Sequence, residues 1–346
     1  MRRPASEHSN AVPADCFADL HSTLATVVAR VETAMRTDLE HSLDQCDPLL
    51  IEVVHYSLFN GGKRIRPLLT VLCSRSCGRD DGDLYLLAGA FEYLHVATLI
   101  HDDIIDQAAQ RRGKKTVVAR YGKTAAILAG DWLHARSMHL VGKLAGPDSL
   151  EVFCRATQSM VNGEFEQLRH IGDISTSKEQ YLKIIRQKTG NLIASTCVIG
   201  ALYAGADRQQ QHALRTYGSH IGEAFQIVDD LLDFQGNAAQ TGKQIGNDFV
   251  EGKITLPLLY ALAEASPADK EIMKELIEGD RTQPSSYEAL VANIERYNGF
   301  NLAAGTARQL ISTAIEILRT MPVHEDGGQA THLLQRLASY LLTRKR

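Results

Sequence analysis

The spacing of the apolar residues restricts this chain to one fold class. From about residue 19 onward they recur mostly every three or four positions, which is the period of an α-helix. The alternation of Val, Ile and Thr expected of strands is nearly absent, and glycine and proline interrupt the pattern, for example at Gly61-Gly62, Gly146-Pro147 and Gly205. The sequence therefore predicts an all-α protein.

The chain is predicted to form one domain. Residues 1–18 are polar, contain Pro4 and Pro13 and have no consistent period, so we expect a poorly ordered tail. No later break has the composition of a flexible linker. Residues 19–346 are therefore predicted to form a single large helical bundle, which is long enough to bury a stable core.

Local signals predict where some helices begin. Ser177 followed by Gln180, and Ser285 followed by Glu288, have the spacing of a capping box. Pro257 suits the first turn of a helix, because its missing N–H has no partner to lose there.

Composition excludes several classes of protein. The hydrophobic content of 44% is ordinary for a globular protein, and the net charge of −4 argues against nucleic-acid binding. The six cysteines form no Cys-x-x-Cys pair, so we expect reduced thiols in the cytoplasm rather than a zinc site or disulfides. We find no signal peptide and no run of about 18 uncharged apolar residues, and therefore predict no transmembrane segment.

Two acidic clusters share one pattern inside apolar helical stretches. They are Asp102-Asp103-Ile104-Ile105-Asp106 and Asp229-Asp230-Leu231-Leu232-Asp233. At about 100° per residue, the first and last carboxylates of a cluster differ by about 40° and point to the same side of their helix. Two solvated helix faces are the alternative, but repetition in apolar surroundings favours a cation site.

Magnesium is the cation that this pattern favours. Carboxylates are costly to bury without compensation. Mg²⁺ takes oxygen ligands, usually one or two carboxylates with water and substrate phosphates. Two facing helices of this kind would hold the ion against a diphosphate, so Mg²⁺ is the predicted cofactor.

Basic residues lie where such an anion would bind. Gly61-Gly62-Lys63-Arg64-Ile65-Arg66-Pro67 joins a permissive backbone to Lys63 and Arg66, which would be neighbours on a helix that begins after the glycines. Arg111-Arg112-Gly113 follows the first acidic cluster, and arginine binds phosphate through a planar fork. The alternatives are a basic helix start paired with acidic neighbours and a solvated loop.

Weaker signals accompany these. His95 lies seven residues before Asp102 and shares its helix face, although a lone histidine is more often a core residue. Lys188-Thr189-Gly190 adds polar groups, and Gln226 lies one turn before the second cluster.

The segment from Gly242 to Lys253 contains two glycine-flanked lysines, Lys243 and Lys253. It is predicted to be either a mobile lid over phosphates or an ordinary exposed loop.

Together these motifs resemble the trans-isoprenyl diphosphate synthases. The resemblance rests on the motifs above with Gly130-Asp131 and Gly163-Glu164, in this order, and extends from about residue 25 to the C-terminus. It is closest to the long-chain bacterial type, which makes octaprenyl or similar diphosphates for quinone side chains. It implies an isoprenoid synthase bundle with a central cavity, a homodimer, and isopentenyl and allylic diphosphates as substrates. We expect peripheral membrane contact at most, as the product leaves.

The resemblance also implies roles for individual residues. Those matching the metal and catalytic positions are Asp102, Asp106 and Asp229 as direct magnesium ligands, with Asp103, Asp230 and Asp233 in support and Lys188 beside them. Those resembling the isopentenyl diphosphate site are Lys63, Arg66, His95 and Arg112. Those matching the allylic diphosphate side are Arg111, Lys188, Thr189, Gln226, Lys243 and Lys253.

The implied chemistry is ionisation of the allylic diphosphate, attack by the isopentenyl double bond on the resulting cation, and loss of a proton. The growing tail would run down an apolar tunnel below the first acidic cluster. Ala97 and Thr98 are small, so we expect a deep tunnel and a long product. Met160 or Phe165 would then limit its depth.

Other functions stay open. A short-chain geranylgeranyl or farnesyl synthase shares the motifs, whereas a class I terpene cyclase needs no isopentenyl site. A non-catalytic partner subunit often lacks an acidic cluster, and both clusters are intact here. A helical scaffold with incidental acidic faces would show no magnesium dependence.

Overall fold

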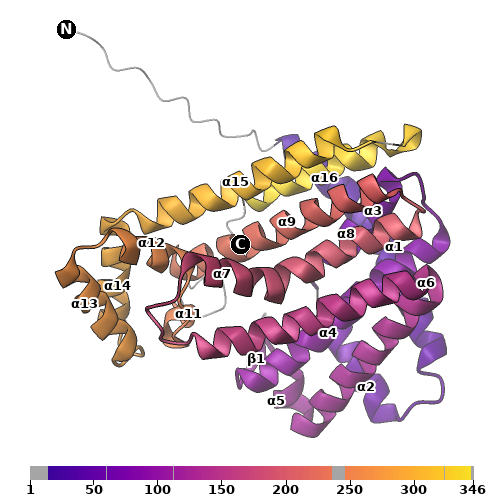
Figure 1. Cartoon of the computed structure of the whole chain (residues 1–346). Coiled ribbons are helices and arrows are strands. Elements are labelled where there is room, and N and C mark those ends of the chain that lie inside the picture. Colours follow the sequence, from indigo (N-terminus) through magenta and orange to yellow (C-terminus); the bar gives the residue numbers. More distant parts are fainter. Residues whose placement is uncertain (1–14, 60, 112, 236–245, 323, 344–346) are drawn as a thin grey trace.

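The computed structural model describes residues 15–59, 61–111, 113–235, 246–322 and 324–343. Within these ranges the regular structure is helical apart from one two-stranded ribbon, which confirms the predicted all-α class (Figure 1). Helix α1 (Asp15–Ser42) begins inside the predicted tail, and the rest of that tail lies outside the described ranges.

The first half of the chain contains α2 (Pro48–Leu58), α3 (Ile65–Ser76), α4 (Gly82–Ile105), β1 (Gln110–Arg111), β2 (Lys114–Lys115), α5 (Val117–Tyr121) and α6 (Lys123–Arg169). The second half contains α7 (Lys178–Ile185), the π-helical turn η1 (Arg186–Gly190), α8 (Asn191–Tyr203), α9 (Arg208–Gln235), α11 (Asn247–Val250), α12 (Leu256–Glu264), α13 (Pro267–Glu278), α14 (Pro284–Arg296), α15 (Gly299–Thr320), the 3₁₀ turn η2 (Glu325–Gly327) and α16 (Gly328–Leu341).

The helices α4, α6, α8 and α9 form the centre of the bundle. α4 packs along α6, and α9 packs against both α8 and α15. α3 packs against α4 and α8, and α16 covers α3 (Figure 1). This arrangement places the two helices that carry the acidic clusters, α4 and α9, on opposite sides of α3 and α8.

Buried apolar side chains form two clusters. One surrounds α4 and α6 and contains Phe91 and Phe153, whose ring centroids lie 5.6 Å apart. The other surrounds α9, α12 and α15 and contains Tyr217. α3 contributes Leu68 to the first and Leu69 to the second. Burying a side chain of this size stabilises a fold by about 1.5–3 kcal/mol, so both clusters hold the central helices in place.

The predicted helix starts are correct at two positions and wrong at a third. Ser177 and Gln180 form a capping box at the start of α7, and Pro257 lies in the first turn of α12. α14 instead begins at Pro284, and its N-cap, Gln283, makes no side-chain cap hydrogen bond. Proline at the first helical position pre-sets the backbone, which makes a capping box at Ser285 unnecessary.

Among the described residues, α4 alone is long and apolar enough to cross a membrane. Of its most apolar window, 72% is buried inside the protein. Its apolar character is therefore explained by its central place in the bundle.

Gly200 on α8 marks a close approach to α3. A Cβ atom at this position would overlap the carbonyl oxygen of Thr70 and lie 3.2 Å from Cβ of Cys73. We expect Gly200→Ala to lower the free energy of unfolding by about 1–3 kcal/mol, because both contacts are backbone or short side chain and cannot move aside. Denaturant unfolding measures this change.

Gly328→Ala provides the matched control, because no atom lies within 4 Å of a Cβ built at Gly328. We expect it to change the free energy of unfolding by less than about 0.5 kcal/mol. Equal stability of the two variants would contradict the close packing of α3 on α8.

Candidate functional site

The first acidic cluster lies at the C-terminal end of α4. Asp102 is partly buried, and its pKa is raised to about 6 by burial and by the negative charge of Glu164, with a smaller effect from Asp106. The pKa of Asp106 is raised as well, by burial and by Glu251. Asp102 and Asp106 therefore repel each other across one turn, as expected of carboxylates on one helix face, and the site favours a cation.

Asp103 faces a different direction. It is buried and accepts a hydrogen bond from Nε of Arg111 at 2.8 Å. The β1–β2 ribbon holds Arg111, which pairs in register with Lys114. The sequence predicted a loop or a basic site here, and the ribbon is the element that positions it.

The second acidic cluster lies near the C-terminal end of α9. Asp230 is buried, accepts hydrogen bonds from Oη of Tyr181 at 2.6 Å and Nε2 of Gln226 at 2.9 Å, and has its pKa raised to about 7 by burial and by Asp248. Asp233 accepts a hydrogen bond from the backbone N–H of Asp248 at 3.0 Å.

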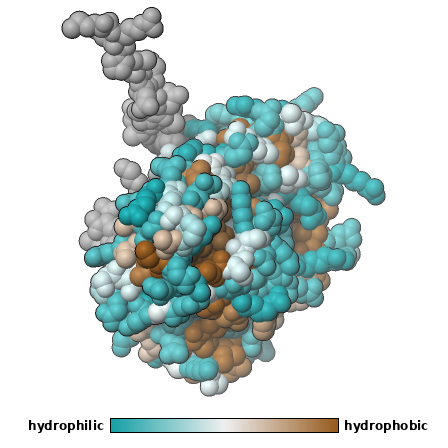
Figure 2. All heavy atoms as spheres, turned by 60° about the vertical axis from the view of Figure 1, so that its left-hand side comes forward, coloured by the Kyte–Doolittle hydropathy of each residue, from teal (hydrophilic) through white to brown (hydrophobic). Residues whose placement is uncertain are grey.

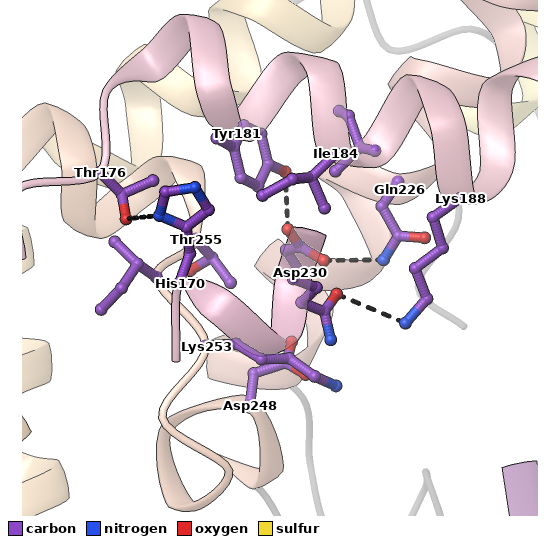
Figure 3. Close-up of a pocket in the computed structure, with 13 residues that line it drawn as sticks. His170, Thr176, Tyr181, Ile184, Lys188, Gln226, Asp230, Asp248, Lys253 and Thr255 are labelled. Carbon is purple, nitrogen blue, oxygen red and sulfur yellow. Dashed lines mark hydrogen bonds and ion pairs between the residues drawn. The ribbon is translucent and has the colours of Figure 1, made fainter. Parts of the chain in front are cut away.

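A pocket opens beside this cluster (Figure 3). Its polar lining includes Lys188, Gln226, Asp230 and Lys253, all four of which the sequence predicted as site residues. Hydrogen bonds hold the lining together, since Oγ1 of Thr189 donates to Oε1 of Gln226 at 2.9 Å. Five predicted residues therefore meet at one place.

The two lysines of this pocket are already paired with carboxylates outside the acidic clusters. Nζ of Lys188 lies 2.8 Å from Glu164. Nζ of Lys253 lies 3.0 Å from Asp248 and 2.5 Å from Glu251. Burial lowers the pKa of Lys253, but Asp248 and Glu251 more than offset this, and its pKa is raised. These ion pairs hold both lysines at the pocket.

Gly163 explains why Glu164 reaches Lys188. A Cβ atom at Gly163 would lie 2.7 Å from the backbone nitrogen of Lys188, so α6 touches the π-helical turn η1 here. The sequence analysis included Gly163-Glu164 in the family resemblance but assigned Glu164 no role.

A second pocket includes Asp103 of the first acidic cluster in its lining. Its lining includes Arg64, Glu92, His95, Asp103 and Arg111. The sequence placed Arg111 with Lys188, but Arg111 lines the pocket of His95 and pairs with Asp103 of α4.

Lys63 and Arg66 do not share a helix as predicted. α3 begins at Ile65, and Lys63 precedes it outside any helix or strand, with Nζ 5.9 Å from the ring centroid of Tyr340. Arg64, the N-cap, adopts the left-handed conformation at φ 50°, which ends the possibility of a continuous helix.

Arg64 is a residue that sequence reasoning missed. Its side chain is buried and pairs with Glu92 at 2.5 Å and Glu32 at 3.1 Å. These partners lie 28 and 32 residues away, so no local signal could identify them. The pairing fixes the segment from which Lys63 and Arg66 project.

Arg66 is the predicted residue with an unused donor. Burial lowers its pKa, although Glu92 and Asp229 raise it. Its Nε is buried and has no hydrogen-bond partner among the described residues. An unpaired buried donor is costly, which makes this guanidinium ready to receive an anion.

Two predicted site residues, Arg112 and Lys243, lie outside the described residues. Their roles stay predictions.

The described residues do not by themselves form a complete metal site. No group of three or more His, Cys, Asp or Glu side chains among them could hold an ion. Magnesium commonly takes one or two carboxylates and completes its shell with water and phosphate oxygens. The carboxylates of α4 and α9 therefore fit an ion held jointly by the protein and a diphosphate.

Of the two residues predicted to limit the depth of the product tunnel, one does not lie in the interior. Phe165 is 65% exposed on α6 and points away from the interior, whereas Met160 packs partly buried against the α4–α6 cluster. The helical period alone did not separate the inner from the outer face of α6. Ala97 is buried on α4, as a residue below the first acidic cluster should be.

Known proteins resemble this chain in sequence and in fold. The polyprenyl synthetase family model matches residues 47–294. The octaprenyl diphosphate synthase of Haemophilus influenzae is 34% identical over 278 residues, which cover 80% of this chain and 84% of that protein.

Solved structures of such proteins have the same fold as this chain. A decaprenyl diphosphate synthase from Rhodobacter capsulatus superposes with a TM-score of 0.85 at 33% identity and covers 96% of this chain and 100% of its own. A polyprenyl synthase from Caulobacter crescentus, solved with calcium and isoprenyl diphosphate, has a TM-score of 0.83 at 33% identity, covering 93% of this chain and 98% of its own.

Asp102→Asn should stabilise the metal-free protein above pH 6. The pKa of Asp102 is raised on folding, so its ionised form opposes folding, and the stability that protonation gives is lost as pH rises through about 6. A neutral amide removes this penalty, and we expect the free energy of unfolding at pH 8 to rise by about 1–3 kcal/mol.

Denaturant unfolding in EDTA at pH 8 and pH 4 tests this prediction. The gain should be present at pH 8 and absent at pH 4, where the carboxyl is protonated in the folded protein. A variant less stable than the parent at pH 8 would show that Asp102 is not desolvated in the metal-free fold.

Proposed function

Because the chain belongs to the polyprenyl synthetase family, we propose that its two pockets are the diphosphate sites of the condensation that it catalyses. The chain is a prenyltransferase of the long-chain trans-polyprenyl diphosphate synthase type, with isoprenyl diphosphates as substrates. The proposal concerns which residues do the work. Residues 19–346 would act as a single domain, and a quinone side chain is the proposed destination of the product.

The observation that carries the assignment is the unpaired Nε of Arg66. The residue is partly buried, its Nε atom is fully buried, and its charge is favoured by both Glu92 and Asp229. A phosphate oxygen would satisfy the donor and convert a costly buried group into a strong charge-assisted hydrogen bond. We assign Lys63, Arg66, His95 and Arg112 to isopentenyl diphosphate.

The allylic diphosphate is assigned to the pocket shown in Figure 3. Lys188 and Lys253 supply two ammonium groups there, and Gln226 supplies an amide. The remaining members of this assignment are Arg111, Thr189 and Lys243. Because Arg111 lines the other pocket, it would contact the allylic diphosphate from the side of the isopentenyl site.

The chain's own residues then act as follows. Lys188 and Lys253 move from their carboxylate partners to the diphosphate and stabilise the negative charge that builds as the allylic carbon–oxygen bond breaks. The hydroxyl of Thr189 and the amide of Gln226 direct oxygen dipoles at the allylic cation. Arg66 holds isopentenyl diphosphate so that its double bond meets that cation.

The metal is assigned to Asp102, Asp106 and Asp229, with Asp103, Asp230 and Asp233 in support. A divalent cation belongs to the activity of this family, and one relative was solved with calcium and isoprenyl diphosphate. We propose Mg²⁺ for this chain, because it prefers carboxylates combined with phosphate oxygens. When bound, it would neutralise charge on the departing diphosphate.

Incubation of the purified protein with Mg²⁺, labelled isopentenyl diphosphate and farnesyl diphosphate should give a ladder of products that ends at a long polyprenyl diphosphate. EDTA should abolish the ladder, and excess Mg²⁺ should restore it, since the diphosphates cannot be neutralised without the ion. Chromatography of the labelled products measures the outcome. No elongation from farnesyl, geranyl or geranylgeranyl diphosphate would instead favour the partner-subunit function.

A homodimer is proposed through the outer face of α6. Val161, Phe165 and Leu168 follow helical spacing on this face and are 49%, 65% and 58% exposed. Leu128 lies in the part of α6 before Gly146, where the backbone leaves the helical conformation, and is 60% exposed. Apolar patches surrounded by hydrophilic residues are visible on the face shown in Figure 2. A second copy would cover this row, and membrane contact during product release would use other surface.

Phe165→Glu should shift the protein from a dimer toward a monomer of 38.1 kDa. A charge placed in an apolar contact loses the burial of the ring and leaves an unpaired carboxylate, so we expect dimer affinity to fall at least about tenfold. Light scattering during size-exclusion chromatography measures the mass.

Leu302→Glu is the control, because Leu302 is an exposed apolar residue of α15, 37% exposed, outside the proposed face. It should leave the mass unchanged. A monomeric parent protein, or equal masses for both variants, would contradict the assigned interface.

A further inference from the structure

Asp230 has donors on both of its carboxylate oxygens. Asp230 is 4% exposed. Oη of Tyr181 donates to Oδ2 at 2.6 Å, and Nε2 of Gln226 donates to Oδ1 at 2.9 Å (Figure 3). These two hydrogen bonds hold the carboxylate of Asp230 in one orientation and tie α9 to α7.

These bonds belong to a longer run that joins three elements. Thr189 on η1 donates to Gln226 on α9 at 2.9 Å. Gln226 donates in turn to Asp230, and Tyr181 on α7 closes the run from the opposite side. The turn that carries Lys188 is thereby tied to the helix that carries the second acidic cluster.

Tyr181 is the fixed end of this run. It is 4% exposed within the apolar cluster of α9 and α12, and the capping box at Ser177 holds the start of its helix. Burial, followed by the charge of Asp230, raises the pKa of Tyr181, so its hydroxyl stays protonated and remains a donor. A short, rigid side chain of this kind can hold its partner in one orientation.

The anchored residue determines where its neighbour points. Adjacent residues of an α-helix project about 100° apart. With Asp230 held toward α7, Asp229 projects to another side of α9, where its charge reaches Arg66 on α3. A rotation of α9 about its axis would move Asp229 away from that place.

We propose that Tyr181 is a positioning residue of this synthase, whose hydroxyl acts through Asp230 to keep Asp229 facing the metal-bound diphosphate. The inference rests on the proposed role of the second acidic cluster. Tyr181 itself need not touch the metal or the reacting atoms. Groups that orient metal ligands through hydrogen bonds contribute roughly 10–100-fold to metal affinity or activity. Tyr181 acts one residue further away, through Asp230, so we expect an effect near the lower end of this range.

Tyr217 offers a matched control on the same helix bundle. It is fully buried, and its hydroxyl donates to the backbone carbonyl of Leu334 at 2.8 Å, between α9 and α16. Tyr217→Phe therefore removes a buried tyrosine hydroxyl and its hydrogen bond without touching the acidic cluster.

The experiment compares Tyr181→Phe with Tyr217→Phe in the full chain. The Mg²⁺ concentration for half-maximal activity and the KM for farnesyl diphosphate should rise about tenfold or more in Tyr181→Phe, while the KM for isopentenyl diphosphate stays within about twofold. Tyr217→Phe should match the parent in all three quantities. A thermal shift on adding Mg²⁺ with inorganic diphosphate should be reduced in Tyr181→Phe alone.

Asp230→Asn completes a double-mutant cycle. This variant keeps an acceptor for the tyrosine hydroxyl and tests the loss of charge alone, so its effect should multiply with that of Tyr181→Phe. Asp230→Ala removes the acceptor, and its effect combined with Tyr181→Phe should be smaller than the product of the two single effects. If Tyr181→Phe behaves like Tyr217→Phe, or if the effects of Tyr181→Phe and Asp230→Ala simply multiply, the positioning role is wrong. An inactive parent protein would instead overturn the proposed function and leave the diphosphate thermal shift as the test of Tyr181.

Discussion

Carboxylates that lie among apolar helices need cations nearby, and the layout of this site follows from that requirement. Arg111 pairs with Asp103, and Lys188 pairs with Glu164. These two basic groups, which would receive a diphosphate in the proposed function, are therefore already paired with carboxylates. In the proposed function, binding is an exchange of partners, in which these cations turn from carboxylates to phosphate oxygens.

The features that could be predicted from the sequence depend on short-range geometry. Helical period, Gly and Pro positions and the capping box at Ser177 all act within one or two turns, and the structure agrees with them. The spacing of Asp102 and Asp106 works in the same way, because one helix turn brings the two carboxylates together. Ser285 failed because Pro284 begins the same helix by a different device.

The features that could not be predicted depend on contacts between distant segments. Arg64 pairs with residues 28 and 32 positions away, and its left-handed backbone separates Lys63 from the helix of Arg66. Tyr181 lies 49 residues from Asp230. Phe165 shows the complementary failure, because a helix that is apolar on two faces gives no sign of which face is covered by the same chain.

The contact of Gly163 with the backbone of Lys188 has a consequence for how this protein can change. On one turn of α6, Val161 and Phe165 face outward, whereas Gly163 and Glu164 face the lysine of the pocket. Because both faces belong to one helix, a movement of the outer face also moves the inner face. A substitution on the outer face that shifted α6 would also shift Gly163 against the backbone of Lys188. Substitutions tolerated on this outer face are therefore limited to those that leave the axis of α6 in place.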